Sequence, residues 1–203
     1  MKSMGIYDKI KGFMVNPTET FRNVKEESLG KALKYFVILL IFYSLVNGIV
    51  LTIMLDSLWG RLMTSSYRIL PIVGTVFESG PEINAVIVIF IFLFIMGFIG
   101  IFISGAIIHL GVLLFGGKKG YKQTVKALIY GGTPSYLLAW IPVGGLFSGI
   151  WAFILEIIGV RELQEFSTAR ALAAVLIPII IIGAVVFFIA AAAVFIYIST
   201  VID

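Results

Sequence analysis

Long apolar runs, nearly free of charged residues, constrain this chain more than any other feature. Hydrophobic residues make up 60% of its 203 positions and charged residues only 13%, which is too little polar surface to enclose a soluble core. A membrane-spanning helix needs roughly 20 apolar residues. We therefore predict an all-α polytopic membrane protein with five transmembrane helices, at Tyr35–Leu55, Asn84–Phe115, Thr124–Ile141, Val143–Gly159 and Ala169–Val201.

The distribution of Lys and Arg predicts the orientation of these helices. Seven basic residues precede the first span, two lie in the first connection, four in the second, none in the third and two in the fourth. A cytoplasmic N-terminus places thirteen basic residues inside and two outside, which is the bias that membrane proteins show. We expect the C-terminus to be extracytoplasmic. The topology accounts for the net charge of +4, so no nucleic-acid partner is predicted.

Residues 1–34 are predicted to form a cytoplasmic amphipathic segment ahead of a membrane domain at 35–203. Apolar residues recur with helical spacing in its first part, at Ile6, Ile10, Phe13 and Met14. Basic residues surround them, so this helix is expected to lie on an anionic membrane surface. A docking site for a soluble partner is the alternative.

The sequence NPTET at 16–20 predicts a second N-terminal helix, with Asn16 as its N-cap and Glu19 completing a capping box. Basic and aromatic residues of the N-terminal segment and of the second connection are the candidates for contact with a membrane surface or a partner. They are Lys9, Lys11, Phe13, Lys118, Lys119 and Lys122.

Three polar side chains within the predicted spans need an explanation: His109, Tyr130 and Glu156. Ionisable groups in lipid cost at least ~2.5–3.5 kcal/mol on insertion scales. At ~1.5 Å per residue, all three fall in the cytoplasmic half, so a shared polar cluster is geometrically allowed. The candidates for ligand binding are His109, Tyr130, Thr133, Glu156 and Arg161.

Two of these candidates, His109 and Glu156, also have a purely structural interpretation. His109 would make one buried hydrogen bond between helices, and Glu156 would pair with Arg161 or Arg170 or reach the interface. The functional alternative is a site that responds to protons or headgroups and opens toward the cytoplasm.

The sequence YGGTP at 130–134 is expected to interrupt the third span. Pro134 frees the carbonyl of Tyr130, which then needs a partner in Thr133, a neighbouring helix or water. We interpret the interruption as a packing kink, with a binding site as the alternative. Small residues also share one face of the second span and predict close helix packing there; they are Gly97, Gly100, Ser104 and Gly111.

Catalytic and metal chemistry find no support in the sequence. The chain has no cysteine and one histidine, which excludes thiol catalysis, Fe–S clusters and multi-histidine metal centres. GVLLFGGKK at 111–119 lacks the Ser or Thr of a phosphate loop. Ser148 lies near the outer end of the fourth span, too far from His109 for a hydrogen bond. We predict no enzymatic activity, no cofactor and no metal.

Two segments carry a resemblance to a known family. They are GYKQTVKALIYGGTPSYL and GIWAFILEIIGVRELQEFSTARALAAVLIP, and with them the N-terminal NPTETF. From about Asn16 to Pro178 the chain resembles the Yip1 domain family, and NPTETF is similar to the opening of many prokaryotic members. The resemblance implies a five-span fold with a cytoplasmic N-terminus.

Eukaryotic members of this family associate with Rab GTPases in vesicle trafficking. That function is not carried over, because this chain has a short basic arm in place of their long acidic or proline-rich one. The composition, rich in Ile and free of Cys, suits an archaeal source, and we expect a prokaryotic cell membrane as its location.

Two functional hypotheses follow. The first is a non-enzymatic protein that organises the membrane or acts as an adaptor, with membrane lipids, a cytoplasmic protein and a second copy of the chain as candidate partners. The second is a small transporter, channel or lipid-moving protein with a polar cavity that faces the cytoplasm.

Overall fold

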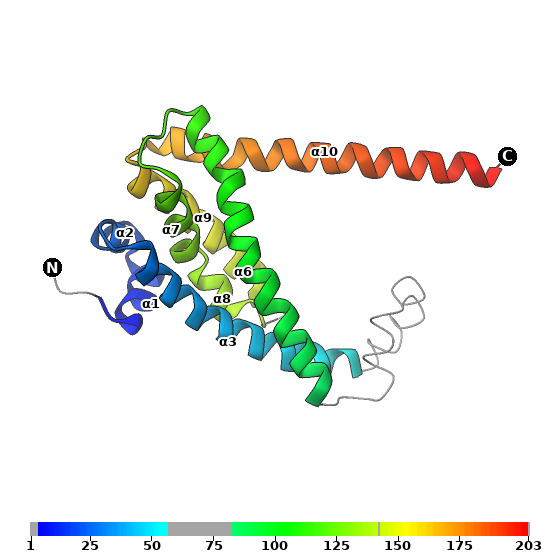
Figure 1. Cartoon of the computed structure of the whole chain (residues 1–203), viewed down its shortest axis with the longest axis horizontal. Coiled ribbons are helices and arrows are strands. Elements are labelled where there is room, and N and C mark those ends of the chain that lie inside the picture. Colours follow the sequence, from blue (N-terminus) through cyan, green and yellow to red (C-terminus); the bar gives the residue numbers. More distant parts are fainter. Residues whose placement is uncertain (1–3, 57–82, 142, 203) are drawn as a thin grey trace.

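The five segments predicted to span the membrane are all helical (Figure 1). The computed structural model describes residues 4–56, 83–141 and 143–202, and within these residues it contains helices and no strand. The helices are α3 (Leu29–Asp56), α6 (Ile83–Leu114), α7 (Tyr121–Gly131), α8 (Thr133–Leu138), α9 (Gly144–Gln164) and α10 (Thr168–Ile202). The prediction of an all-helical chain is therefore confirmed for the described residues.

Three of these helices are long and apolar enough to cross a membrane, counting the described residues only: α3, α6 and α10. The third predicted span is divided between α7 and α8, and the fourth corresponds to α9. The first connection, with its two basic residues, lies outside the described residues. The count of five spans and the orientation of the termini stay predictions.

Two N-terminal helices precede α3, as predicted: α1 (Ile6–Val15) and α2 (Pro17–Val24). Asn16 is the N-cap of α2. The predicted capping box is wrong in one part, because Glu19 accepts a hydrogen bond from the side-chain amide of Asn16. The backbone N–H of Asn16 instead donates to the carbonyl of Gly12, at 2.8 Å, and so ends α1.

The apolar face of α1 packs against the protein. Phe13 is completely buried, with its ring centroid 4.8 Å from that of Phe21 on α2 and 5.0 Å from that of Tyr130 on α7. Lys9 on the same helix is only 5% exposed. The prediction that Phe13 and Lys9 contact a membrane surface or a partner is therefore corrected. Aromatic rings from α2 and α7 cover this face.

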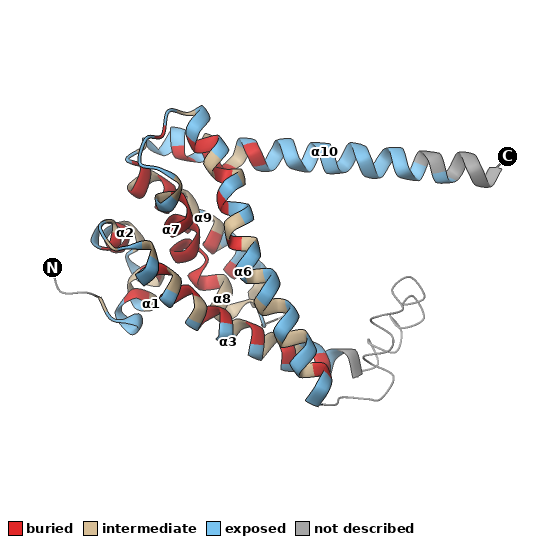
Figure 2. Ribbon diagram, in the orientation of Figure 1, coloured by how far each residue is buried: buried red, intermediate tan, exposed pale blue. Residues whose placement is uncertain are grey.

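Helix α7 lies at the centre of the structure, with α3, α6 and α9 packed around it (Figure 2). Every residue from Thr124 to Pro134 is buried. Glycine permits the closest approach, because a Cβ atom on Gly131 would lie 2.8 Å from the backbone nitrogen of Glu156 on α9. The YGGTP sequence thus brings two helices into backbone contact.

Helix α10 leaves the other helices beyond Pro178 (Figure 1). It is anchored to α6 where Gly111 lies directly against the backbone of Ala174 and the ring of Pro178. From Ile179 to Val194 every residue is exposed, and all of them are apolar. In a membrane this stretch is surrounded by lipid or by another protein.

Candidate functional site

The side chain of Lys9 is the buried charge that joins the N-terminal helices to the core. Its Nζ lies 2.6 Å from a carboxylate oxygen of Glu27, in the loop between α2 and α3, and 3.5 Å from the hydroxyl of Tyr130. Tyr130 donates its own hydrogen bond to Glu27 at 2.7 Å. The ammonium group also lies 5.3 Å and 5.8 Å from the ring centroids of Tyr130 and Tyr35, within cation–π range. We call Lys9, Glu27 and Tyr130 the latch.

Glu27 is held in its ionised form by the latch. Burial raises the pKa of Glu27, but the hydrogen bonds from Lys9 and Tyr130 and the charges of Lys9 and Lys31 lower it further, so the net shift is downward from 4.5. The side chains of Lys9 and Glu27 are only 6% and 10% exposed. A charge pair shielded to this extent costs about 3–5 kcal/mol when one partner is removed.

The carbonyl freed by Pro134 finds its partner within the same turn. The hydroxyl of Thr133 donates to the carbonyl of Tyr130 at 2.6 Å. Because its hydrogen is used there, Thr133 accepts the hydrogen bond from the hydroxyl of Tyr35, at 3.0 Å. Both rings and the threonine are buried. Of the partners we considered, Thr133 satisfies the carbonyl, and the interruption between α7 and α8 is explained by packing.

His109 makes the single interhelical hydrogen bond that its structural interpretation predicted. Its Nδ1 lies 2.9 Å from the hydroxyl oxygen of Thr124 on α7. Gln164 at the end of α9 donates to the same oxygen at 3.0 Å, and the ring of Tyr121 packs edge-on against the imidazole. His109 therefore helps to connect α6, α7 and α9.

Glu156 occupies a different environment from the other predicted site residues. It lines a cavity of about 390 Å³ between α6, α7, α8, α9 and α10, together with Tyr136. Neither His109 nor Tyr130 lines this cavity. The three residues lie at similar depth along their helices, but the structure places them in three separate surroundings.

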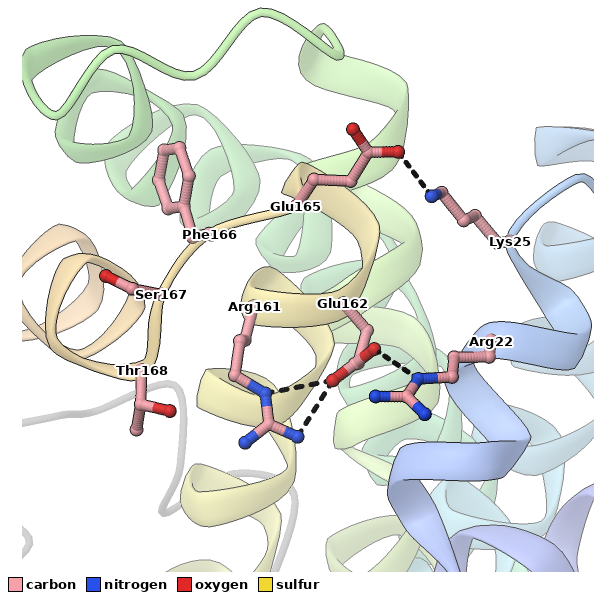
Figure 3. Close-up of a pocket in the computed structure, with 8 residues that line it drawn as sticks. All are labelled: Arg22, Lys25, Arg161, Glu162, Glu165, Phe166, Ser167 and Thr168. Atoms are coloured by element: carbon pink, nitrogen blue, oxygen red, sulfur yellow. Dashed lines mark hydrogen bonds and ion pairs between the residues drawn. The ribbon is translucent and has the colours of Figure 1, made fainter.

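Arg161 lines a pocket together with other charged side chains from α2 and from the end of α9 (Figure 3). Its guanidinium group contacts Glu162, with Nε at 2.9 Å, and donates to the hydroxyl of Thr18 at 3.2 Å. Arg22 on α2 approaches the same carboxylate at 2.8 Å. Glu156 makes no ion pair with Arg161 in the structure, so the interpretation of Glu156 as its partner is wrong.

A second acidic residue joins the helices at this end. Glu165 pairs with Lys25 and, at 2.6 Å, with Lys119. Hydrogen bonds and charge from these two lysines lower the pKa of Glu165 to about 2. A pocket of about 700 Å³ lies among Arg22, Arg161 and these acidic groups. We call this region, formed by α2, the end of α9, the loop 115–120 and the turn 165–167, the charged end.

The remaining surface candidates are exposed. Lys11 is exposed on α1, Lys118 in the loop 115–120 of the charged end, and Lys122 in the first turn of α7. Lys119 is exposed at 43% of its side chain while it pairs with Glu165. Their contact with a membrane or a partner stays a prediction.

Sequence reasoning missed two residues that shape this region. Glu27 is 18 positions from Lys9 and belongs to no periodic pattern. Lys126 is only 2% exposed, and its Nζ donates to the carbonyl of Lys25 at 2.7 Å. Its position between the apolar residues Val125 and Ala127 was the signal that this lysine is buried.

The arrangement as a whole defines a class of protein. A chain that is all-helical among its described residues, with three helices long and apolar enough to cross a membrane, is an integral membrane protein. The model of one family, the Yip1 domain, matches residues 11–197, so the chain belongs to the Yip1 domain family. The resemblance noted in the sequence is thus confirmed. No curated protein and no solved structure matches the chain.

Replacing Lys9 by Ala is expected to loosen the N-terminal helices. The substitution leaves Glu27 buried without its counter-ion, which costs about 3–5 kcal/mol. Thermal unfolding of the purified protein in detergent, with hydrogen exchange of residues 6–24, measures the effect. Lys11→Ala is the matched control, because Lys11 lies on the same helix and is exposed. Equal unfolding temperatures and equal exchange in both variants would contradict the role of the latch.

The latch is also expected to weaken in acid. Because the folded state lowers the pKa of Glu27 below 4.5, its stabilisation is complete above that value and is lost as the pH falls through the folded pKa. The difference in unfolding temperature between the wild type and Glu27→Gln should therefore be largest near neutral pH and vanish well below pH 4.5. Parallel curves for the two proteins would show that the charge of Glu27 does not stabilise the latch.

Proposed function

We propose that the protein is a non-enzymatic membrane organiser or adaptor of the Yip1 type, which engages anionic lipid headgroups through its charged end. A cytoplasmic protein with an acidic surface is the other partner that this end suits. The proposal includes five spans, a cytoplasmic N-terminus and a prokaryotic cell membrane. The bias of basic residues toward one side supports that orientation.

The observation that carries the proposal is that some basic residues at the charged end pair with glutamates, whereas others nearby are exposed and form no ion pair with a described residue. Arg22, Arg161 and Lys25 pair with glutamates that connect α2 to the end of α9. Lys118 is exposed in the loop 115–120 and Lys122 in the first turn of α7, and neither forms an ion pair with a described residue. The paired residues hold α2 against the end of α9, and the exposed lysines are available to a ligand outside the chain.

Helix α10 supplies a second point of contact within the membrane. Every residue of its apolar stretch from Ile179 to Val194 is exposed. Lipid or a second copy of the chain would cover it, and association of copies through α10 is part of the proposal.

Binding to anionic vesicles tests the main proposal. Proteoliposomes of the wild type should capture phosphatidylglycerol vesicles, and high salt should weaken capture because charge drives it. Lys118→Glu with Lys122→Glu should reduce the affinity on the order of tenfold or more, since each basic residue near a membrane contributes about 1 kcal/mol. The control, Lys118→Arg with Lys122→Arg, keeps the charge and should bind normally. Equal capture by both double variants would contradict the proposal.

The cavity beside Glu156 favours a second candidate, a small transporter or lipid-moving protein. A polar group inside a membrane domain often marks a substrate pathway. In a flux or scrambling assay with proteoliposomes, this candidate requires activity that Glu156→Ala abolishes and His109→Ala reduces little, because His109 lies outside the cavity. Wild-type protein without activity toward any lipid or ion tested would reject it.

A further inference from the structure

Glu156 is set apart from the other half-buried acidic residues by its lack of a partner. Glu27 is paired with Lys9, and Glu162 with Arg22 and Arg161. No described residue donates a hydrogen bond to Glu156 or forms an ion pair with it. In a membrane, a carboxylate that lies among apolar helices and is left unpaired is costly. Its carboxyl group must therefore hold a proton or face a cation that enters from outside the chain.

The surroundings of Glu156 have the properties of a binding site. The cavity holds about 390 Å³, within the range of small-molecule pockets. Its walls are mostly apolar, and its other polar groups come from Tyr136 and Ser104. An aromatic ring beside a carboxylate is a combination that suits an ammonium group.

At Gly100 on α6 the neighbouring helices do not pack tightly, so this part of the cavity wall is open. A Cβ atom on Gly100 would meet nothing within 4 Å, whereas one on Gly97 would lie 2.6 Å from Leu40. Both glycines line the cavity. Gly97 thus serves the packing that the sequence predicted for this seam, and Gly100 leaves room beside Glu156.

The cavity is accessible from the side of the helices that faces lipid. Two of its lining residues, Ser104 on α6 and Ile179 on α10, are exposed on the surface of apolar helices. Helix α10 diverges from α6 just beyond this point (Figure 1). A ligand that enters here arrives from the membrane, so it needs an apolar portion as well as a charge.

We infer that this cavity binds the ammonium group of an amphiphile, with Glu156 as its counter-ion and Tyr136 beside it. The amine belongs either to a lipid headgroup or to a long-chain amine dissolved in the membrane. An anion is disfavoured because, among the described residues that line the cavity, the ionisable ones are Glu156 and Tyr136 and none is basic. The inference is independent of the proposed role of the charged end, and it requires binding without requiring transport.

Binding of a radiolabelled long-chain amine tests the inference. The full-length protein in micelles of the non-ionic detergent dodecyl maltoside should bind hexadecylamine saturably, after subtraction of empty micelles, and should not bind the neutral N-hexadecylacetamide. Glu156→Gln should weaken binding on the order of thirtyfold, as expected when a buried charge partner is truncated. Glu156→Asp keeps the charge and should retain part of the affinity.

A cavity-filling variant tests the site without changing Glu156, so that loss of binding can be distinguished from loss of the fold. Gly100→Leu should abolish binding while Glu156 is intact, and Gly149→Leu is the control. Gly149 is exposed on α9, its Cβ would also meet nothing within 4 Å, and it does not line the cavity. Unfolding temperatures establish that each variant is folded. Competition by phosphatidylethanolamine would identify a lipid headgroup as the ligand, and its absence would identify the long-chain amine.

Three results would overturn the inference. The first is no saturable binding of hexadecylamine to the wild type. The second is equal binding of the neutral amide, which would show that the cavity recognises only the chain. The third is unchanged affinity in folded Glu156→Gln and Gly100→Leu, which would place the bound amine elsewhere and leave Glu156 with a proton.

Discussion

Burial of the Lys9 ammonium group is the constraint on which the position of the N-terminal helices depends. A lysine that is 5% exposed needs an anion and further donors or acceptors nearby. The chain supplies Glu27 from the next loop and the hydroxyl of Tyr130 from the central helix. Helices α1 and α2 are therefore fixed to α7 by charge as well as by the stacked ring of Phe13, and α2 in turn positions the arginine that pairs with Glu162.

The burial of α7 explains why its junction with α8 has the composition YGGTP. A helix covered on all sides must satisfy its backbone internally, and Thr133 does so for the carbonyl of Tyr130. Glycine at position 131 lets the backbone of α9 approach. The same short sequence thus ends one helix, starts the next and places the hydroxyl of Tyr130 against Glu27. A break that could be taken for a ligand site is accounted for by contacts within the chain.

The sequence predicted the helices well because composition and periodicity determine them. It was harder to predict which face of each helix contacts protein and which contacts lipid. Helix α6 is apolar on every side, so no pattern indicates which face carries protein and which carries lipid, and the equal depth of His109, Tyr130 and Glu156 did not show that they face different neighbours. On α1 the pattern identified the apolar face correctly. It did not identify what covers that face, and Phe13 packs on Tyr130 where we had expected lipid.

Opposite kinds of charge are left uncompensated in the two regions of interest. At the charged end the glutamates are paired, and lysines such as Lys118 and Lys122 are exposed without an ion pair to a described residue. In the cavity among the apolar helices the situation is reversed, because a carboxyl group is present without a basic partner. A solute favoured at one region is disfavoured at the other. The two regions are therefore not consecutive binding sites on one transport pathway for a simple ion. The proposed attraction of anionic surfaces and the inferred recognition of an amine are therefore separable, and loss of one need not abolish the other.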